Sequence, residues 1–413
     1  MNTRTLLTAV TLVAAGTTVA SAVNFKEIGR LDVTALQDAS GRPIAQPLSV
    51  GFSGGILYVG EFGAGGQVVR IDDPLGSATV ANVFGTPAIH ARGVDSLDAN
   101  FEYVASVSGF DINAATDDLL EVHTIGGVQT LSVITDAPLA TPANYGADGR
   151  GFSGVALDPG FNGQGPAAVS SVVFAQRQRI ANDVNGGALL SGDPGTAEYR
   201  NEVATTGGVD VAYNDQTGDH YLLTIEGISK MTRDGAQSFV QYPNPPFPTQ
   251  GWYTQASLGL TYFGNADFNQ DQNLEFVNAA KSGGGLPTDL LLVNNPRNAA
   301  TASPALVDIV EAFDANAPLG SGDNPASDSA NDVAINWMAP DGSPFVQAAQ
   351  TFVDFGVNPF DAIVYDFAYD IETRVLAVSD LGSGHVYFFA VPEPASAALL
   401  GLGGLAALRR RQA

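Results

Sequence analysis

Short segments of alternating apolar and polar residues, separated by turns rich in Gly, Asn and Asp, run through most of the chain. In the clearest unit an apolar strand ends at the polar turn Asp370–Thr373, and the alternation then resumes towards Ser379. Half-buried antiparallel strands have this two-residue period. Similar units occupy residues 48–71, 207–231 and 364–389. The pattern predicts an all-β body.

The strand units recur at regular spacing along the chain. They begin near residues 48, 93, 151, 207, 258 and 364, so the starts lie about 45 to 58 residues apart with one gap of double length. Such spacing is typical of four-stranded propeller blades. It predicts a body with six or seven blades, and the repeats resemble β-propellers of the YVTN/NHL kind without a diagnostic blade motif. Tandem β-sandwich domains, whose strands also alternate, are the alternative.

The first predicted strand, residues 25–33, lies far from the other strands in the sequence. We expect it to complete the last blade beside residues 386–389, because this pairing closes the ring and covers a sheet edge. Helix is scarce in the pattern. A turn or two is expected only at 331–338 or at 346–353.

The amino-terminal segment differs from the body. Arg4 precedes an apolar run, Leu6 to Ala15, and small residues ending in Ala20-Ser21-Ala22 follow. A short apolar run before an Ala-x-Ala sequence is typical of a secretory signal peptide. We therefore expect residues 1–22 to be removed by signal peptidase after Ala22.

The carboxyl-terminal segment contains three features in a fixed order. These are the tripeptide Pro392-Glu393-Pro394, the apolar run Ala395–Leu408, and the basic residues Arg409, Arg410 and Arg411. Together they resemble the PEP-CTERM sorting tail of bacterial exported proteins. The resemblance implies that a membrane protease, an exosortase, recognises and cuts the tail at or near the tripeptide.

Each part of the tail has a physical function in this interpretation. Two prolines prevent helix formation and sheet pairing, so the tripeptide remains accessible backbone. The arginines favour the cytoplasmic side of a membrane. Fourteen apolar residues form a helix of roughly 21 Å, which is shorter than a hydrocarbon core of about 30 Å. A short transmembrane helix of this kind suits a temporary anchor.

These segments divide the chain into a signal peptide at 1–22, an extracellular body at 23–391 and a sorting tail at 392–413. We expect an intermediate in the inner membrane, followed by transfer to the cell surface or the extracellular matrix. The chain contains no cysteine, so disulfides do not stabilise the body and its stability must come from core burial.

The chain is strongly acidic. Its formal net charge is −25, and the body without Arg4 and the residues from Pro392 onwards is near −28. Such a field repels nucleic acid and anionic membrane surfaces, so neither is an expected partner of the body. It favours solubility and divalent cations.

One local motif has the spacing of a calcium loop, because oxygen-bearing side chains occupy every second position. Its candidate ligands are Asp267, Asn269, Asp271, Asn273 and Glu275. Ca²⁺ binds six to eight oxygen ligands, which alternate residues of a tightly coiled loop supply. The motif departs from EF-hand and dockerin loops at Gln272, where those loops have glycine, and at Asn278, where a bidentate carboxylate is expected. The alternative is a polar turn between strands.

No group of residues in the sequence forms a recognisable catalytic motif. The histidines, at positions 90, 123, 220 and 385, lack zinc-ligand spacing, and the glycine-rich segments lack the lysine of a phosphate-binding loop. We therefore expect a non-enzymatic scaffold that contacts extracellular polysaccharide or surface proteins, with Ca²⁺ as its candidate cofactor. The alternative is a calcium-dependent propeller hydrolase of the lactonase or phosphoesterase type.

Overall fold

The structure is a computed structural model of the whole chain. It describes residues 22–90, 93–96, 102–108, 119–125, 132–134, 150–158, 171–178, 187–192, 199–205, 208–214, 217–224, 227–233, 239–242, 253–254, 273–279, 286–294, 305–316, 333–350 and 365–392. Strands account for nearly all regular structure in these ranges. The helical elements described are the 3-10 turn η1 (Val33–Ala35) and the short helix α1 (Leu306–Ile309). No helix within the described ranges is long and apolar enough to cross a membrane.

The described strands form six separate sheets, which we call blades 1 to 6. Blade 1 contains β2 (Pro47–Ser53), β3 (Ile56–Asp72) and β4 (Thr79–His90). Blade 2 contains β5 (Gly93–Ser96), β6 (Glu102–Ser108), β7 (Leu119–Ile125) and β8 (Ser132–Ile134). Blade 3 contains β9 (Arg150–Asp158), β10 (Ser171–Gln178), β11 (Gly187–Gly192) and β12 (Tyr199–Thr205).

The second half of the ring has the same plan. Blade 4 contains β13 (Gly208–Tyr213), β14 (His220–Thr224), β15 (Gly227–Arg233), β16 (Phe239–Tyr242) and β17 (Tyr253–Thr254). Blade 5 contains β18 (Leu274–Val277), β19 (Leu290–Asn294) and β20 (Val310–Asp314). Blade 6 contains β22 (Tyr365–Asp370), β23 (Val375–Asp380), β24 (His385–Ala390), β1 (Val23–Asp32) and β21 (Ile335–Met338).

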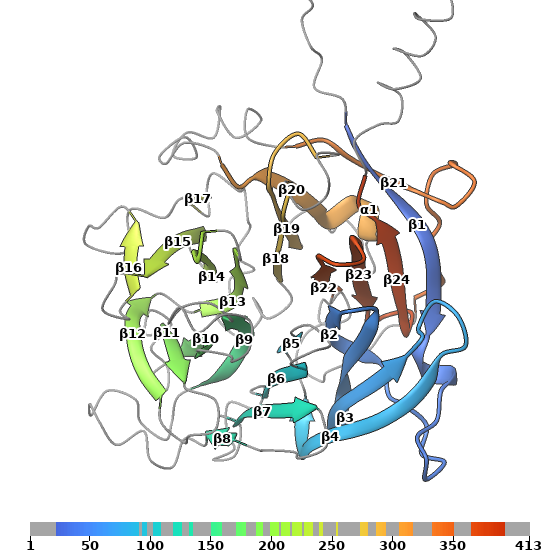
Figure 1. Cartoon of the computed structure of the whole chain (residues 1–413), viewed down its shortest axis with the longest axis horizontal. Coiled ribbons are helices and arrows are strands. Elements are labelled where there is room, and N and C mark those ends of the chain that lie inside the picture. The colour runs from blue at the N-terminus through green and yellow to red at the C-terminus, as the bar shows by residue number, and fades with distance from the viewer. Residues whose placement is uncertain are drawn as a thin grey trace, which may run out of the picture.

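The first strand of each blade lies at the centre of the molecule. Strands β2, β5, β9, β13, β18 and β22 each contact the next one in this order, and β22 contacts β2. Figure 1 shows the blades arranged in a circle around these innermost strands. The body is therefore a β-propeller, which confirms the propeller prediction over the sandwich alternative.

Blade 6 closes the ring with strands from both ends of the body, as predicted. Strand β1 pairs antiparallel with β24, with Arg30 opposite Tyr387 and Lys26 opposite Ala390. On its other side β1 pairs in parallel with β21. The first strand of the body thus becomes an internal strand of the last blade, and an edge that would otherwise be free is paired.

Aromatic packing holds β1 in this position. Phe25 is completely buried and stacks on Trp337 of β21 with 5.0 Å between ring centroids. Trp337 in turn meets the edge of Phe389 of β24 at 4.7 Å. These rings belong to a core cluster that also includes Leu290 and Tyr365. The closing strand is therefore joined to blades 5 and 6 through apolar contacts as well as through backbone hydrogen bonds.

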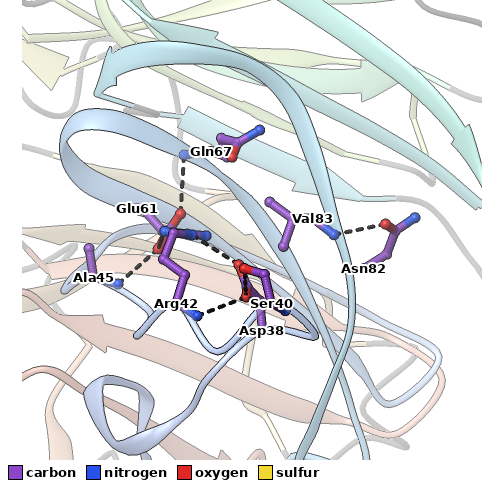
Figure 2. Close-up of polar contacts among 8 residues, drawn as sticks. All are labelled: Asp38, Ser40, Arg42, Ala45, Glu61, Gln67, Asn82 and Val83. Atoms are coloured by element: carbon purple, nitrogen blue, oxygen red, sulfur yellow. Dashed lines mark hydrogen bonds and ion pairs between the residues drawn. The ribbon is translucent and has the colours of Figure 1, made fainter.

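An ion-pair network fixes the connection from β1 to blade 1 (Figure 2). Glu61 of β3 is fully buried, and its Oε1 accepts hydrogen bonds from Arg42 and from the backbone N–H of Ala45, both at 2.8 Å. Arg42 also donates to Asp38 at 3.0 Å. Because Glu61 is buried with its charge paired and hydrogen-bonded, it anchors the connecting loop against β3.

Several local predictions need correction. Innermost strands begin close to five of the six predicted unit starts, but the unit expected near residue 258 begins at Leu274, where β18 starts. Residues 335–338, within the segment expected to be helical, form the strand β21, and 346–350 contain no helix. The glycine-rich segment 63–66 lies within β3, whose register with β4 is irregular there. Tertiary pairing therefore overrides local propensity at these places.

Candidate functional site

Four acidic side chains lie on innermost strands near the centre of the propeller. Asp95 is on β5, Asp210 on β13, Glu275 on β18 and Asp366 on β22. Asp210 and Asp366 are only 8% and 7% exposed, whereas Asp95 and Glu275 are half-buried. We call these four residues the central carboxylates. They are the strongest concentration of ionisable groups at the centre of the described structure.

Each central carboxylate accepts a hydrogen bond from a backbone N–H of the following blade. The N–H groups of Leu157 and Leu274 donate to Asp95 and Asp210, respectively, both at 2.7 Å. Val50 donates to Asp366 at 2.8 Å. Tyr369 donates to Glu275 at 3.2 Å. The inward edge of an innermost strand has no further strand to pair with, so its N–H groups need other acceptors. The central carboxylates supply them at four of the six junctions between blades.

Glycines serve the other two junctions by allowing close approach. A Cβ on Gly154 of β9 would lie 2.5 Å from the Cα of Asp210 in blade 4. A Cβ on Gly51 of β2 would lie 3.1 Å from the hydroxyl of Ser96 in blade 2. Carboxylates therefore join neighbouring innermost strands at four junctions, and glycines allow the close approach of these strands at the other two.

Burial raises the pKa of three central carboxylates. Loss of solvent raises the pKa of Asp95 to about 6, although hydrogen bonds from Leu157 and Ser96 oppose the rise. The pKa values of Glu275 and Asp366 are also well above their usual range. Burial is the largest cause for both, and repulsion from other central carboxylates adds to it, chiefly from Asp95 on Glu275 and from Asp210 on Asp366. The four groups therefore interact electrostatically across the centre.

Such groups have two chemical uses. A carboxyl group with a raised pKa near a channel is suited to proton transfer, and ionised carboxylates attract cations. However, no three His, Asp or Glu side chains come together as a metal site in the ranges that the structure describes. The hydrogen bonds described above show that each of the four groups joins two blades at its own junction.

The central carboxylate of blade 6 lies away from the point where the chain leaves the propeller. Strand pairing places Tyr365 beside Asp380 and His385 at one end of the blade, and Asp370 beside Val375 and Ala390 at the other. Asp366 follows Tyr365 directly. It is therefore near the His385 end, whereas the tail begins at the Ala390 end.

A second polar cluster surrounds Asp380 at the His385 end. Asp380 is 1% exposed and accepts hydrogen bonds from Ser383 at 2.5 Å and from Gln347 at 2.6 Å. Gln347 and Gln350 also donate to the hydroxyl of Tyr365. Burial raises the pKa of Asp380 despite these donors. The cluster attaches the segment 344–350 to blade 6.

The proposed calcium loop is only partly within the described residues. Asp267, Asn269 and Asp271 lie outside them. Asn273 is buried and its amide donates to the carbonyl of Tyr365 at 2.7 Å, and Glu275 is one of the central carboxylates. The part of the motif that is described therefore joins blade 5 to blade 6.

His220 and His385, whose side chains the structure describes, make structural contacts. His220 is completely buried at the start of β14 and packs against Tyr213, and the Nδ1 of His385 lies 2.8 Å from the carbonyl of Ser383. Both residues begin strands. Their positions are not equivalent, however, because β14 is the second strand of its blade and β24 is the third.

The sequence contains a signal for three of the central carboxylates, which are not part of the motifs described above. Asp95, Asp210 and Asp366 each follow an apolar residue at the second or third position of an innermost strand. Two of them stand in repeat units that were recognised from strand alternation alone. An aspartate that returns at the same place in a repeat would have identified the junctions.

The carboxyl-terminal residues match a known sorting signal. Residues 390–412 match the PEP-CTERM protein-sorting motif, which agrees with the tail predicted from the tripeptide, the apolar run and the arginines. The motif indicates an exported protein that is anchored through this tail and processed by an exosortase. No curated protein matches the chain.

The body is similar to several solved structures. The major allergen Mala s 1 of Malassezia sympodialis has a TM-score of 0.48 at 8% identity, over 87% of this chain and 95% of that chain. An auxiliary nutrient binding protein from Bacteroides thetaiotaomicron has 0.46 at 10%, over 88% and 76%. A gluconolactonase from Xanthomonas campestris has 0.45 at 10%, over 89% and 91%. Since these TM-scores are below 0.5, the fold assignment rests on the ring of sheets described above.

The raised pKa of Asp95 predicts a pH dependence of stability. An unfolded aspartate has a pKa of about 3.9, so between about pH 4 and pH 6 the folded protein binds more protons than the unfolded chain, and the free energy of unfolding falls as pH rises. Asp95→Asn removes this titration. Over this range we expect the free energy of unfolding of the variant to fall by roughly 2 kcal/mol less than that of the wild-type protein, at about 1.4 kcal/mol per pKa unit. Urea denaturation at a series of pH values measures this difference.

The control for this titration is Asp341→Asn. Asp341 is exposed, and hydrogen bonds from Ser343 lower its pKa, so its stabilising effect appears as pH rises. Its replacement should leave the decline unchanged or make it steeper. An Asp95→Asn protein with the wild-type slope would contradict the assignment of Asp95 as a buried acid.

Proposed function

We propose that this chain is an exported, exosortase-processed protein of the cell surface or extracellular matrix, whose propeller is a non-enzymatic binding scaffold for exopolysaccharide or biofilm components. One observation carries the proposal. The last strand of the closing blade, β24, ends at Ala390, and Val391 is 2% exposed in the core. The tripeptide follows directly. Cleavage there leaves the complete ring intact and removes only the tail.

The arrangement at the centre supports a scaffold more than an enzyme. The central carboxylates bind backbone N–H groups of the adjacent blades, and His220 and His385 make structural contacts. A ring whose innermost strands are joined at every junction is a rigid support for loops that contact a large ligand. Extracellular polysaccharide and surface proteins are the ligand classes that fit an exported acidic body.

Calcium binding through the loop at Asp267, Asn269 and Asp271 belongs to the same proposal. The loop immediately precedes Asn273 and Glu275, which join blade 5 to blade 6. A cation bound there would be next to a blade junction. It would stabilise this part of the ring in the extracellular medium.

The second candidate is a calcium-dependent hydrolase of the lactonase or phosphoesterase type. The observation that favours it is the raised pKa of Glu275 and of Asp366, because acids of this kind are frequent in active sites. The two candidates differ in one respect that an experiment can decide. A scaffold does not turn over substrate, whereas a hydrolase depends on the central carboxylates.

Replacement of the tripeptide tests the sorting route. In the producing cell, Pro392→Ala with Glu393→Ala and Pro394→Ala should keep the tail attached and the protein in the inner membrane, whereas wild-type protein should lose the tail. Intact mass and cell fractionation measure both effects. Glu372→Ala, a change to an exposed acidic residue near the same end of blade 6, should be processed normally. Normal cleavage of the triple variant would overturn the proposal.

Purified protein distinguishes scaffold from hydrolase. We expect no turnover of lactone or phosphoester panels with or without Ca²⁺, and a calorimetric Ca²⁺ signal that Asp267→Ala with Asp271→Ala abolishes. Turnover that Glu275→Gln or Asp366→Asn removes would establish the hydrolase. An unchanged calcium titration in the double variant would remove the loop from the account.

A further inference from the structure

The first and last strands of the body meet at one end of blade 6. Strand β1 begins at Val23 and β24 ends at Ala390, and the antiparallel register sets Lys26 opposite Ala390. The backbone N–H of Val391 then donates to the carbonyl of Arg374 in the turn between β22 and β23. We call this end of the blade, which contains the start of β1, the end of β24 and the turn 370–375, the exit end.

The folded core continues to the edge of the sorting tail. Val391 is buried and hydrogen-bonded, and only Pro392, Glu393 and Pro394 separate it from the apolar run that begins at Ala395. Four residue steps of extended chain span at most about 14 Å. While the tail is inserted, Val391 therefore lies within about 14 Å of the residues that enter the hydrocarbon core.

This tether is short compared with the body. The two ends of β24 are five residue steps apart, which is roughly 17 Å along the strand. A compact domain of this length has a radius of gyration of about 21 Å. Because the headgroup layer of a bilayer is itself only about 5 to 8 Å thick, the tether holds the exit end at or close to this layer, whereas the His385 end lies roughly 17 Å further along the strand from the point of attachment.

We propose that the exit end of blade 6 is a membrane-docking surface, which the tail holds against the lipid headgroups before the protein is cut. The inference rests on the insertion of the tail. The tether, and not net attraction, holds this end at the membrane, and repulsion between the acidic body and anionic lipid favours the orientation in which only the tethered end is close. Lys26, which is exposed on β1 at this end, reduces the repulsion locally.

The orientation has a consequence for what the anchored protein presents to the outside. Tyr365, Asp380 and His385 share the end of blade 6 opposite the exit end, and Asp366 follows Tyr365. The polar cluster around Asp380 and the central carboxylate of this blade thus face away from the membrane. A ligand could therefore reach this end of the propeller before the protein is released.

The amino-terminal strand fits the same geometry. Ala22, the last residue of the expected signal peptide, directly precedes β1 at the exit end. Both segments directed to the membrane therefore join the body at the same end. Strand β1 can pair with β24 while the signal peptide and the sorting tail remain in the bilayer, so ring closure does not require release of either segment.

Energy transfer from single labels to the membrane tests the proposal. The chain has no cysteine, so Glu372→Cys at the exit end and Ala35→Cys near the opposite end each provide one site. Both residues are exposed, and η1, which contains Ala35, bonds Gly384 in the turn before β24. The full-length chain is inserted into phosphatidylethanolamine–phosphatidylglycerol vesicles that contain an acceptor-labelled headgroup. We expect at least twofold higher transfer efficiency from position 372 than from position 35.

The matched control lengthens the tether. A flexible 20-residue Gly/Ser insertion between Val391 and Pro392 has a root-mean-square reach of about 25 Å and should make the two efficiencies similar. Equal transfer from both positions at the native spacing would overturn the docking surface. Flotation of the labelled protein with the vesicles reports tail insertion separately: a chain that floats with equal transfer contradicts only this inference, and a chain that does not float contradicts the sorting proposal as well.

Discussion

Pairing of β1 with β24 is the contact on which the rest of the structure depends. A ring of sheets leaves two exposed edges unless its first and last strands meet, and exposed strand edges promote association with other chains. Here the residues that begin the body form the fourth strand of the last blade, counted from the centre, with Phe25 packed among the rings of β21 and β24. Since the chain has no disulfide to hold its ends, this closure must come from hydrogen bonding and apolar burial.

Closure also explains the chemistry at the centre. Six innermost strands converge there, and each has an edge without a partner strand. Aspartate and glutamate side chains that cross from one blade to the next satisfy several of these N–H groups, but their own charges become buried close together, which raises their pKa values. The same groups therefore join neighbouring blades and are also buried acids. Their hydrogen bonds to the next blade are sufficient to explain their positions.

Strand alternation and repeat spacing allowed the sequence to predict the propeller, the closing strand and most blade starts. Each of these depends on a local pattern that burial enforces along the whole strand. The start of blade 5 was misplaced because an alternating segment near residue 258 precedes its first strand, Leu274 to Val277, and the polar motif of the predicted calcium loop lies between them. Asp95, Asp210 and Asp366 were not predicted from the sequence for a different reason. Their partners are backbone groups in the next blade, 62 residues away in the sequence for Asp95 and 316 for Asp366, so the return of an aspartate at the same place in the repeat is the signal in the sequence for these junctions.

Hydrogen exchange of the native protein tests the ring closure most directly. If β1 is an integral strand of blade 6, the amides of Val23–Asp32 that pair with β24 should exchange as slowly as those of β23, through global unfolding alone. Fast exchange in β1 through local opening, while β22 and β23 stay protected, would show that the ring is open at this junction and would contradict the account.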